Sequence, residues 1–445
     1  MPLVSKESTA RSDTPDAPTF APSTGQLQQA VTHGDHARPA AGANGSAAVP
    51  VPEQSRAERL RSWEAADFEV PTGREEEWRF SPVDRLSEVL ADGSDSGHLT
   101  WTTSLPDGVT CVAIDAQRAR ELSPMPPADR AAALAHSRAG AAMHLDIPAE
   151  VDLGEPVRID LRGVRGPAVF GHTVLTVGRH ARATVILEHA GSASHSGLLS
   201  VVTGDGSELT IVSLQEWDDD AIHLHQQDVV VGRDATVRHI AVTLGGAIVR
   251  MCINAQYAGP GGFFEALGVY FADAGQELES RLFVDHEPPR CKSNVEYKGA
   301  LQGDTAHTVW VGDVLIRATA EGTDTYELNR NLVLTEGARA DSVPNLEIET
   351  GQIQGAGHAS ATGRFDDEQL FYLQSRGIPE GEARRLVVRG FFADIVSRIG
   401  VPDVSERLMA SIDAELALTV GAVPVQSQER ERVAAVAQVV DEAVL

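Results

Sequence analysis

The sequence predicts a mainly β protein, organised as a solenoid of short strands with helical regions towards both ends. Between about residues 150 and 365, runs of four to six residues rich in β-branched types, such as 173–177, are bounded by Gly and Asp, as strands are. Turn-like segments recur, with glycines 26, 28 and 29 residues apart at Gly178, Gly204, Gly232 and Gly261. After residue 366 the apolar residues change to helical spacing.

Loose self-similarity without intervening helices is typical of a solenoid, in which each coil stacks on the next. Aromatic residues make up only 5% of the chain, so its core must be aliphatic, and a ladder of inward Val, Leu, Ile and Ala fits this composition. A β-sandwich also has short strands and glycine turns. Periodicity alone therefore leaves the sandwich open.

The composition divides the chain into four regions. The first has few apolar residues and is expected to be a disordered tail, because it cannot bury enough surface to offset the entropy of ordering. A mixed, largely helical region, the strand core and a small helical domain follow. The boundaries are 1–55 for the Ala/Pro/Ser-rich tail, 56–145 for the N-terminal region, 146–365 for the core and 366–445 for the helical domain.

The predicted helical domain contains three helices and a last segment. Gly377 ends the first helix, and Pro379 suits the first turn of the second. Ser405 could cap the third, and residues 433–444 have helical spacing. One apolar stripe on the second helix comprises Ala383, Leu386, Val387, Phe391, Ile395 and Ile399, with Val388 and Phe392 beside it. The extra apolar surface indicates either a protein-docking patch or a helix packed on two sides.

Charge and cysteine content limit the class of protein. The formal net charge of −27 argues against nucleic acid and anionic membranes as partners. No run approaches 18 apolar residues, and the N-terminus has no apolar signal region, so we expect no membrane span and a cytoplasmic location. Three scattered cysteines, Cys111, Cys252 and Cys291, suit a reducing compartment.

Motifs of the common enzyme classes are absent: there is no Walker loop, nucleophile elbow or His-Glu-x-x-His helix. His223 and His225 follow three aspartates, 218–220, and would share one face of a strand. They could ligate a divalent metal, or form a polar outward face of the solenoid. Cys252 and Cys291 could be thiolate ligands or small buried hydrophobes.

His358 lies among small residues in Gly355–Gly363, which would leave its imidazole accessible. A neutral imidazole is a fair ligand for iron. From the residues alone, an ordinary surface histidine remains the alternative.

Several segments resemble the SufB/SufD family of iron–sulfur cluster assembly scaffolds. Residues 370–378, with Glu382–Arg384 and Gly390–Phe392, resemble the family's C-terminal signature. Residues 341–348 look like its S-x-P-x-L-E-I strand, and 76–80 are similar to the E-E-W-R-Y element of SufD. The resemblance covers about residues 56–420.

The resemblance implies a right-handed parallel β-helix and a SufD-like, non-catalytic scaffold subunit. It implies a heterodimer with a SufB-like paralogue, a SufC-like ABC ATPase as further partner, and a possible homodimer when the chain is alone. No cofactor would be stably bound, and an iron–sulfur cluster would form transiently at the interface with the SufB-like chain. The implied ATPase-docking residues are Phe371, Arg376, Gly377, Leu386, Phe391 and Phe392.

The resemblance also implies that His358 lies at the SufB interface and contributes to cluster formation, as a candidate metal ligand. Many SufD-like chains read Cys-Ser-His here, whereas this chain has Ala356, Gly357 and His358. A thiolate from this loop is therefore impossible. Two alternatives are a SufB-like subunit that carries the cluster directly and a polysaccharide-acting β-helix enzyme, which would need paired carboxylates.

Overall fold

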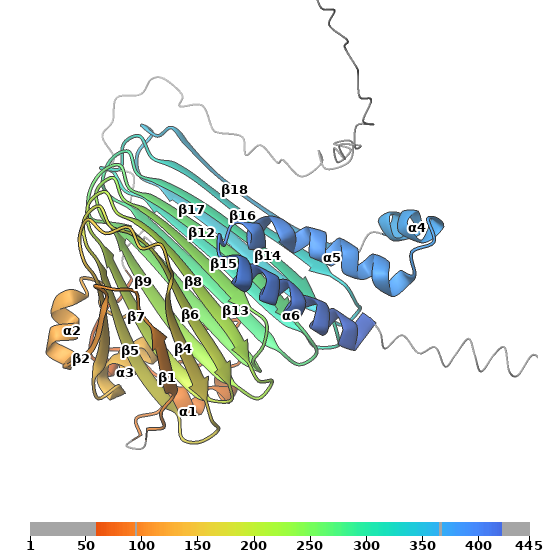
Figure 1. Cartoon of the computed structure of the whole chain (residues 1–445), viewed down its shortest axis with the longest axis horizontal. Helices are drawn as coiled ribbons and strands as arrows, with labels where there is room; N and C mark the ends of the chain where they lie inside the picture. The colour runs from red at the N-terminus through yellow and green to blue at the C-terminus, as the bar shows by residue number, and fades with distance from the viewer. Residues whose placement is uncertain (1–58, 94–95, 365–366, 421–445) are drawn as a thin grey trace, which may run out of the picture. The chain divides into compact units, whose positions relative to one another are not determined.

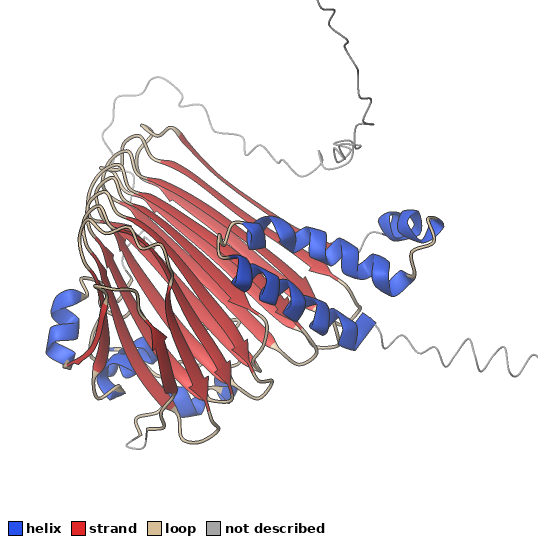
Figure 2. Cartoon of the chain, viewed as in Figure 1, coloured by secondary structure: helices blue, strands red, loops and turns tan. Residues whose placement is uncertain are grey.

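The computed structural model describes residues 59–93, 96–364 and 367–420. Its core is a β-solenoid of two nine-stranded sheets, between which the chain alternates (Figures 1 and 2). In each sheet the strand that comes first in the chain, β1 (Thr100–Ser104) or β2 (Thr110–Ile114), is antiparallel to its neighbour, and the remaining eight strands are parallel. This arrangement confirms the predicted parallel β-helix with helical regions at both ends, and it excludes the β-sandwich.

Sheet A contains, in spatial order, β1 (Thr100–Ser104), β4 (Val157–Gly163), β6 (Arg182–Gly191), β8 (Glu208–Trp217), β10 (Thr236–Thr243), β12 (Phe263–Ala272), β14 (Lys292–Leu301), β16 (Asp324–Val333) and β18 (Gly355–Arg364). Sheet B contains β17 (Arg339–Ile348), β15 (His307–Ile316), β13 (Glu277–His286), β11 (Ile248–Tyr257), β9 (Ile222–Val231), β7 (Ser194–Thr203), β5 (Val169–Val177), β3 (Ala142–Ile147) and β2 (Thr110–Ile114).

The recurring glycines lie where successive coils turn in close contact. A Cβ on Gly204 would lie 2.5 Å from the backbone nitrogen of Arg179, and one on Gly232 would lie 2.7 Å from the carbonyl carbon of Gly204. No side chain fits at such distances, because heavy atoms that close overlap. The sequence interval therefore measures the length of a coil, in agreement with the parallel pairing of Ser200 with Asp228.

Alternate residues of each strand point into the solenoid, where the sheets share one mainly aliphatic core. The outer face of sheet B is covered by the N-terminal region, in which Trp78, Leu86 and Val89 pack with Leu224 and Ile248. The short helices of this region are η1 (Ala65–Asp67), η2 (Val83–Arg85), α1 (Ser87–Leu90), α2 (Ala116–Leu122) and α3 (Arg130–Arg138).

Helices α5 (Glu380–Ser397) and α6 (Pro402–Val420) cover the outer face of sheet A, and α4 (Asp367–Ser375) precedes them (Figure 1). Gly377, with φ of +84°, follows α4 as predicted. Helix α6 begins at Pro402 and not after Ser405, because proline is well suited to a first helical turn. The Ser405 hydroxyl instead donates to the carbonyl of Val396.

The predicted tail, 1–55, and the last helical segment, 433–444, lie outside the described residues. Among the helices that the structure describes, none has both the length and the apolar character needed to span a membrane.

Candidate functional site

The solenoid ends in two strands that each have one neighbour. β17 pairs only with β15, and β18 pairs only with β16, so both outer edges present backbone N–H and C=O groups without a strand partner in the described chain. Much of β18 is exposed, and no residue of β17 is fully buried. Such edges are ready templates for pairing with another chain.

His358 lies on β18 at this open end. It is in register with Glu327 of β16, and neighbouring parallel strands point registered side chains to the same face. Ala356, two residues earlier, packs against the inner core, so His358 also belongs to the inner face. Its imidazole is nevertheless exposed, because β18 is the last coil strand among the residues that the structure describes. The structure thus makes His358 accessible, and its role in cluster formation stays a prediction.

Glu327 lies one coil below His358 and was not singled out from the sequence. Glu327 is 1% exposed, and within the described part of the chain neither carboxyl oxygen has a hydrogen-bond partner. Burial, with a smaller contribution from the Asp313 carboxylate, raises the pKa of Glu327 to about 8. A carboxyl group that is protonated near neutral pH can donate or release a proton. The local sequence Tyr-Glu-Leu-Asn does not indicate that Glu327 is buried, because its burial results only from the stacking of coils.

The three cysteines do not add a thiolate to this end. All are free, and Cys291 is fully buried. Burial raises the pKa of Cys252 to about 12, so this group remains a thiol at neutral pH. With Ala356 at the position expected for cysteine, the open end offers an imidazole and a carboxyl group.

The predicted docking residues fall into an exposed and a buried group. Phe371 is 71% and Leu386 43% exposed. Arg376 and Gly377, also exposed, lie between them in the chain. Phe391 is half-buried, with the ammonium of Lys298 5.9 Å from its ring centre.

The family resemblance implies that Phe392 docks the ATPase, which would require an exposed side chain. Phe392 is instead fully buried against sheet A, so the implied exposure of this residue is wrong. The buried face of α5 also differs from the predicted apolar stripe. The helix face that packs on the sheet contains Val388, Phe392 and Ile395, while Leu386 faces solvent. The sheet, which α5 meets on one side only, determines which of two adjacent apolar faces is buried.

His223 and His225 do not form an outward polar face, as one reading of the sequence proposed. Both are buried inside the solenoid. The preceding aspartates do not join them, because Asp219 accepts a hydrogen bond from Gln276 and Asp220 one from Arg165. The partners are instead His189 and His195, which sequence spacing could not associate with them.

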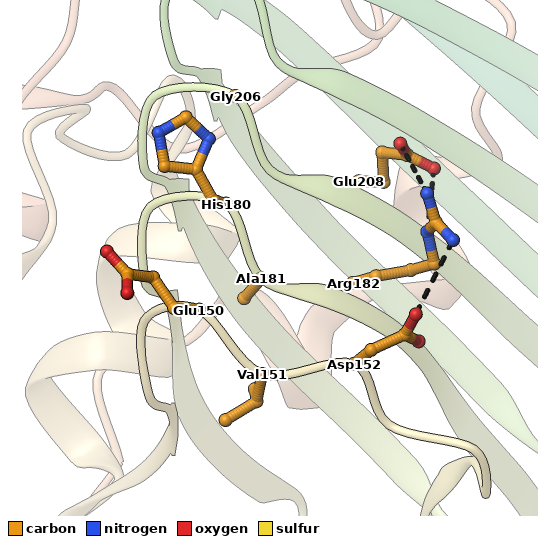
Figure 3. A pocket seen from close by; sticks show the side chains of 8 residues that line it. All are labelled: Glu150, Val151, Asp152, His180, Ala181, Arg182, Gly206 and Glu208. Atoms are coloured by element: carbon orange, nitrogen blue, oxygen red, sulfur yellow. Dashed lines mark hydrogen bonds and ion pairs between the residues drawn. The ribbon is translucent and has the colours of Figure 1, made fainter.

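A surface hollow at the turns between coils is filled by matched charges (Figure 3). Arg182 contacts Glu208 at 2.8 Å and Asp152 at 3.5 Å, and Figure 3 shows its guanidinium between the two carboxylates. The bond to Arg182 lowers the pKa of Glu208. Each strong charge has a partner, so we interpret this hollow as structural.

The open-ended solenoid is similar to a known protein family. Residues 161–391 match the family model for the SufBD core domain of the SUF system of FeS cluster assembly. An iron-sulfur cluster assembly SufBD family protein of Mycobacterium tuberculosis strain H37Rv is 51% identical over 383 residues, or 84% of this chain and 96% of the relative. The chain belongs to the SufBD family.

More distant SufBD relatives carry the name SufD. The iron-sulfur cluster assembly protein SufD of Escherichia coli K12 is 27% identical over 194 residues, which is 44% of this chain and 45% of the relative. SufD of Bacillus subtilis strain 168 is 24% identical over 279 residues, or 61% and 63% of the two chains. The resemblance found in the sequence is thereby confirmed at the level of the family.

Proposed function

We propose that this SufBD family chain is a SufD-type, non-catalytic scaffold subunit of a cytoplasmic iron–sulfur cluster assembly complex. Its partners are a SufB-like paralogue and a SufC-like ATPase, and the cluster is cargo that forms transiently where the paralogues meet. The observation that carries this proposal is the open end, where β17 and β18 each have one edge without a described strand partner and β18 carries an exposed histidine above a buried carboxyl group. The distant relatives named SufD support the subunit assignment.

Pairing with the paralogue takes place through β17 and β18. A second solenoid of the same kind offers matching edges, so the two ends join by strand addition and satisfy each other's backbone groups. His358 then lies inside the interface instead of in water. Since this chain offers no cysteine there, sulfur ligands come from the paralogue.

The ATPase binds the exposed part of the helical domain. Phe371 on α4 and Leu386 on α5 are large apolar side chains exposed to solvent. Exposed apolar residues on otherwise anchored helices are suited to docking a partner whose movement is passed to the solenoid.

The first test is affinity purification of the tagged full-length chain from its native cytoplasm, followed by native mass spectrometry. We expect one SufB-like chain and SufC-like ATPase subunits with each copy. Recovery of the chain alone, or with unrelated proteins, would count against the proposal. In a Phe371→Ala/Leu386→Ala variant, ATPase should be lost while the SufB-like chain is retained.

The role of His358 is tested in the purified complex with His358→Ala. His98→Ala is the matched control, because His98 is exposed and lies outside the open end. We expect the His358 variant to retain its partners but to assemble less cluster, measured by visible absorption and by bound iron and sulfide. Equal cluster yields in both variants would show that His358 is dispensable.

A further inference from the structure

Three histidines meet inside the solenoid, far along the chain from His358. His189 is on β6, His195 on β7 and His223 on β9. One nitrogen from each ring lies within 4.8 Å of the others. All three side chains are at most 4% exposed. The strand pairing produces this cluster, because His195 and His223 are in direct register while His189 approaches from sheet A.

The cluster contains three imidazole nitrogens that have no hydrogen-bond partner among the described residues. These are Nδ1 of His189, Nδ1 of His195 and Nε2 of His223. Buried polar atoms without partners are costly unless something binds them.

We propose that His189, His195 and His223 form a binding site for one divalent transition-metal ion of the zinc or ferrous type. Three neutral imidazoles are a donor set that suits zinc and iron and does not suit magnesium or calcium. This proposal does not rest on the proposed function, because the ion is bound inside one chain and can be measured without a partner or a cluster.

Metal binding requires the rings to shift and to turn one nitrogen each towards a common centre. Metal–nitrogen bonds are about 2.0–2.1 Å long. Corners of a triangle with sides of 4.8 Å, the largest separation in the cluster, lie about 2.8 Å from its centre, so each nitrogen must move inward by roughly 0.7 Å. The rings are already stacked or tilted, with centres 4.8 Å apart for His189 and His223 and 4.9 Å for His195 and His223. His225, with its ring centre 5.1 Å from that of His223, is the nearest further imidazole.

Trp217 competes with the metal for His223. Its indole N–H donates to Nδ1 of His223 at 2.7 Å. Since indole cannot accept, Nδ1 holds the lone pair and the proton of the neutral ring is on Nε2. Metal binding at Nδ1 of His223 displaces the indole N–H directly. Metal binding at Nε2 moves the ring proton to Nδ1, where the new N–H faces the indole N–H and cannot accept from it. In either case the Trp217–His223 bond breaks.

The test is metal analysis of the full-length chain, expressed with added zinc or, under anaerobic conditions, with added ferrous iron, and then washed with EDTA. We expect about one retained ion per chain, as in a closed site of this kind. The identity of the retained ion distinguishes zinc from iron. His195→Leu and His223→Leu should lose the ion. His286→Leu is the matched control, because His286 is equally buried but bonds to Ser293 elsewhere in the solenoid.

Two further measurements do not depend on the folding of the leucine variants. Cobalt added during refolding of the wild-type chain should give the intense visible bands of a tetrahedral nitrogen site and should change the fluorescence of Trp217. Trp217→Phe should bind the ion roughly fivefold more tightly in competition with a chelator, because one hydrogen bond no longer opposes binding. Wild-type chain without retained metal, or equal retention by His195→Leu, would overturn the proposal.

Discussion

Glu327→Gln tests whether the open end holds a carboxyl group that folding keeps protonated. The pKa of Glu327 is raised from 4.5 to about 8 by burial, with Asp313 adding to the shift. Between these two values the unfolded chain releases the proton and the native chain retains it. The wild-type protein therefore loses stability as the pH rises through this range. Glutamine has nearly the same shape and does not titrate.

The magnitude follows from 1.36 kcal/mol for each pH unit of this range. From pH 5 to pH 7.5 the free energy of unfolding of the wild-type chain should fall by about 3 kcal/mol relative to Glu327→Gln. Such a difference is a large fraction of the stability of an ordinary domain.

The assay is urea unfolding at pH 5, 6.25 and 7.5, followed by circular dichroism. Glu336→Gln is the matched control, since Glu336 is an exposed glutamate near the same end. Its profile should run parallel to that of the wild type. If the Glu327→Gln profile is also parallel, Glu327 is ionised in the native chain and the reasoning about its burial is wrong.

Three further predictions concern helix packing, a histidine ion pair and a contact between coils. Phe392→Ala should cost about 3–5 kcal/mol of helix packing on sheet A and make α5 sensitive to limited proteolysis, whereas half-buried Phe391→Ala should have a much smaller effect. Burial alone would lower the pKa of His307. Its bonds to the Glu277 and Asp341 carboxylates outweigh burial, so the pKa of His307 is raised. Wild-type stability should therefore decline as the pH rises above 6.5 through that raised pKa, and thermal melting of His307→Gln should lack this component. Gly204→Ala should prevent accumulation of soluble chain, because its Cβ would overlap the backbone of the adjacent coil at 2.5 Å; normal expression and melting would show that the coils can separate there.

The sequence by itself predicted short strands joined by recurring glycine turns and a helical end. Its periodicity favoured a solenoid but left a β-sandwich open, and the family resemblance supplied the parallel β-helix. The glycine interval predicted the coil because the requirement for a missing side chain recurs wherever two turns touch, as Gly204 and Gly232 do. The helix stop at Gly377 was equally local, since a positive φ favours glycine. The resemblance in the C-terminal segments identified the family and drew attention to His358.

Only the tertiary structure decided which side chains meet. A strand alternates its faces with a period of two, but the sequence does not say which face closes inward. Residues one coil apart, such as Glu327 and His358, become neighbours only when the coils stack in register. His189 joins His195 and His223 for the same reason, across two sheets. Likewise, Phe392 is buried and Leu386 exposed because α5 meets sheet A on one side, a choice that its local sequence leaves open.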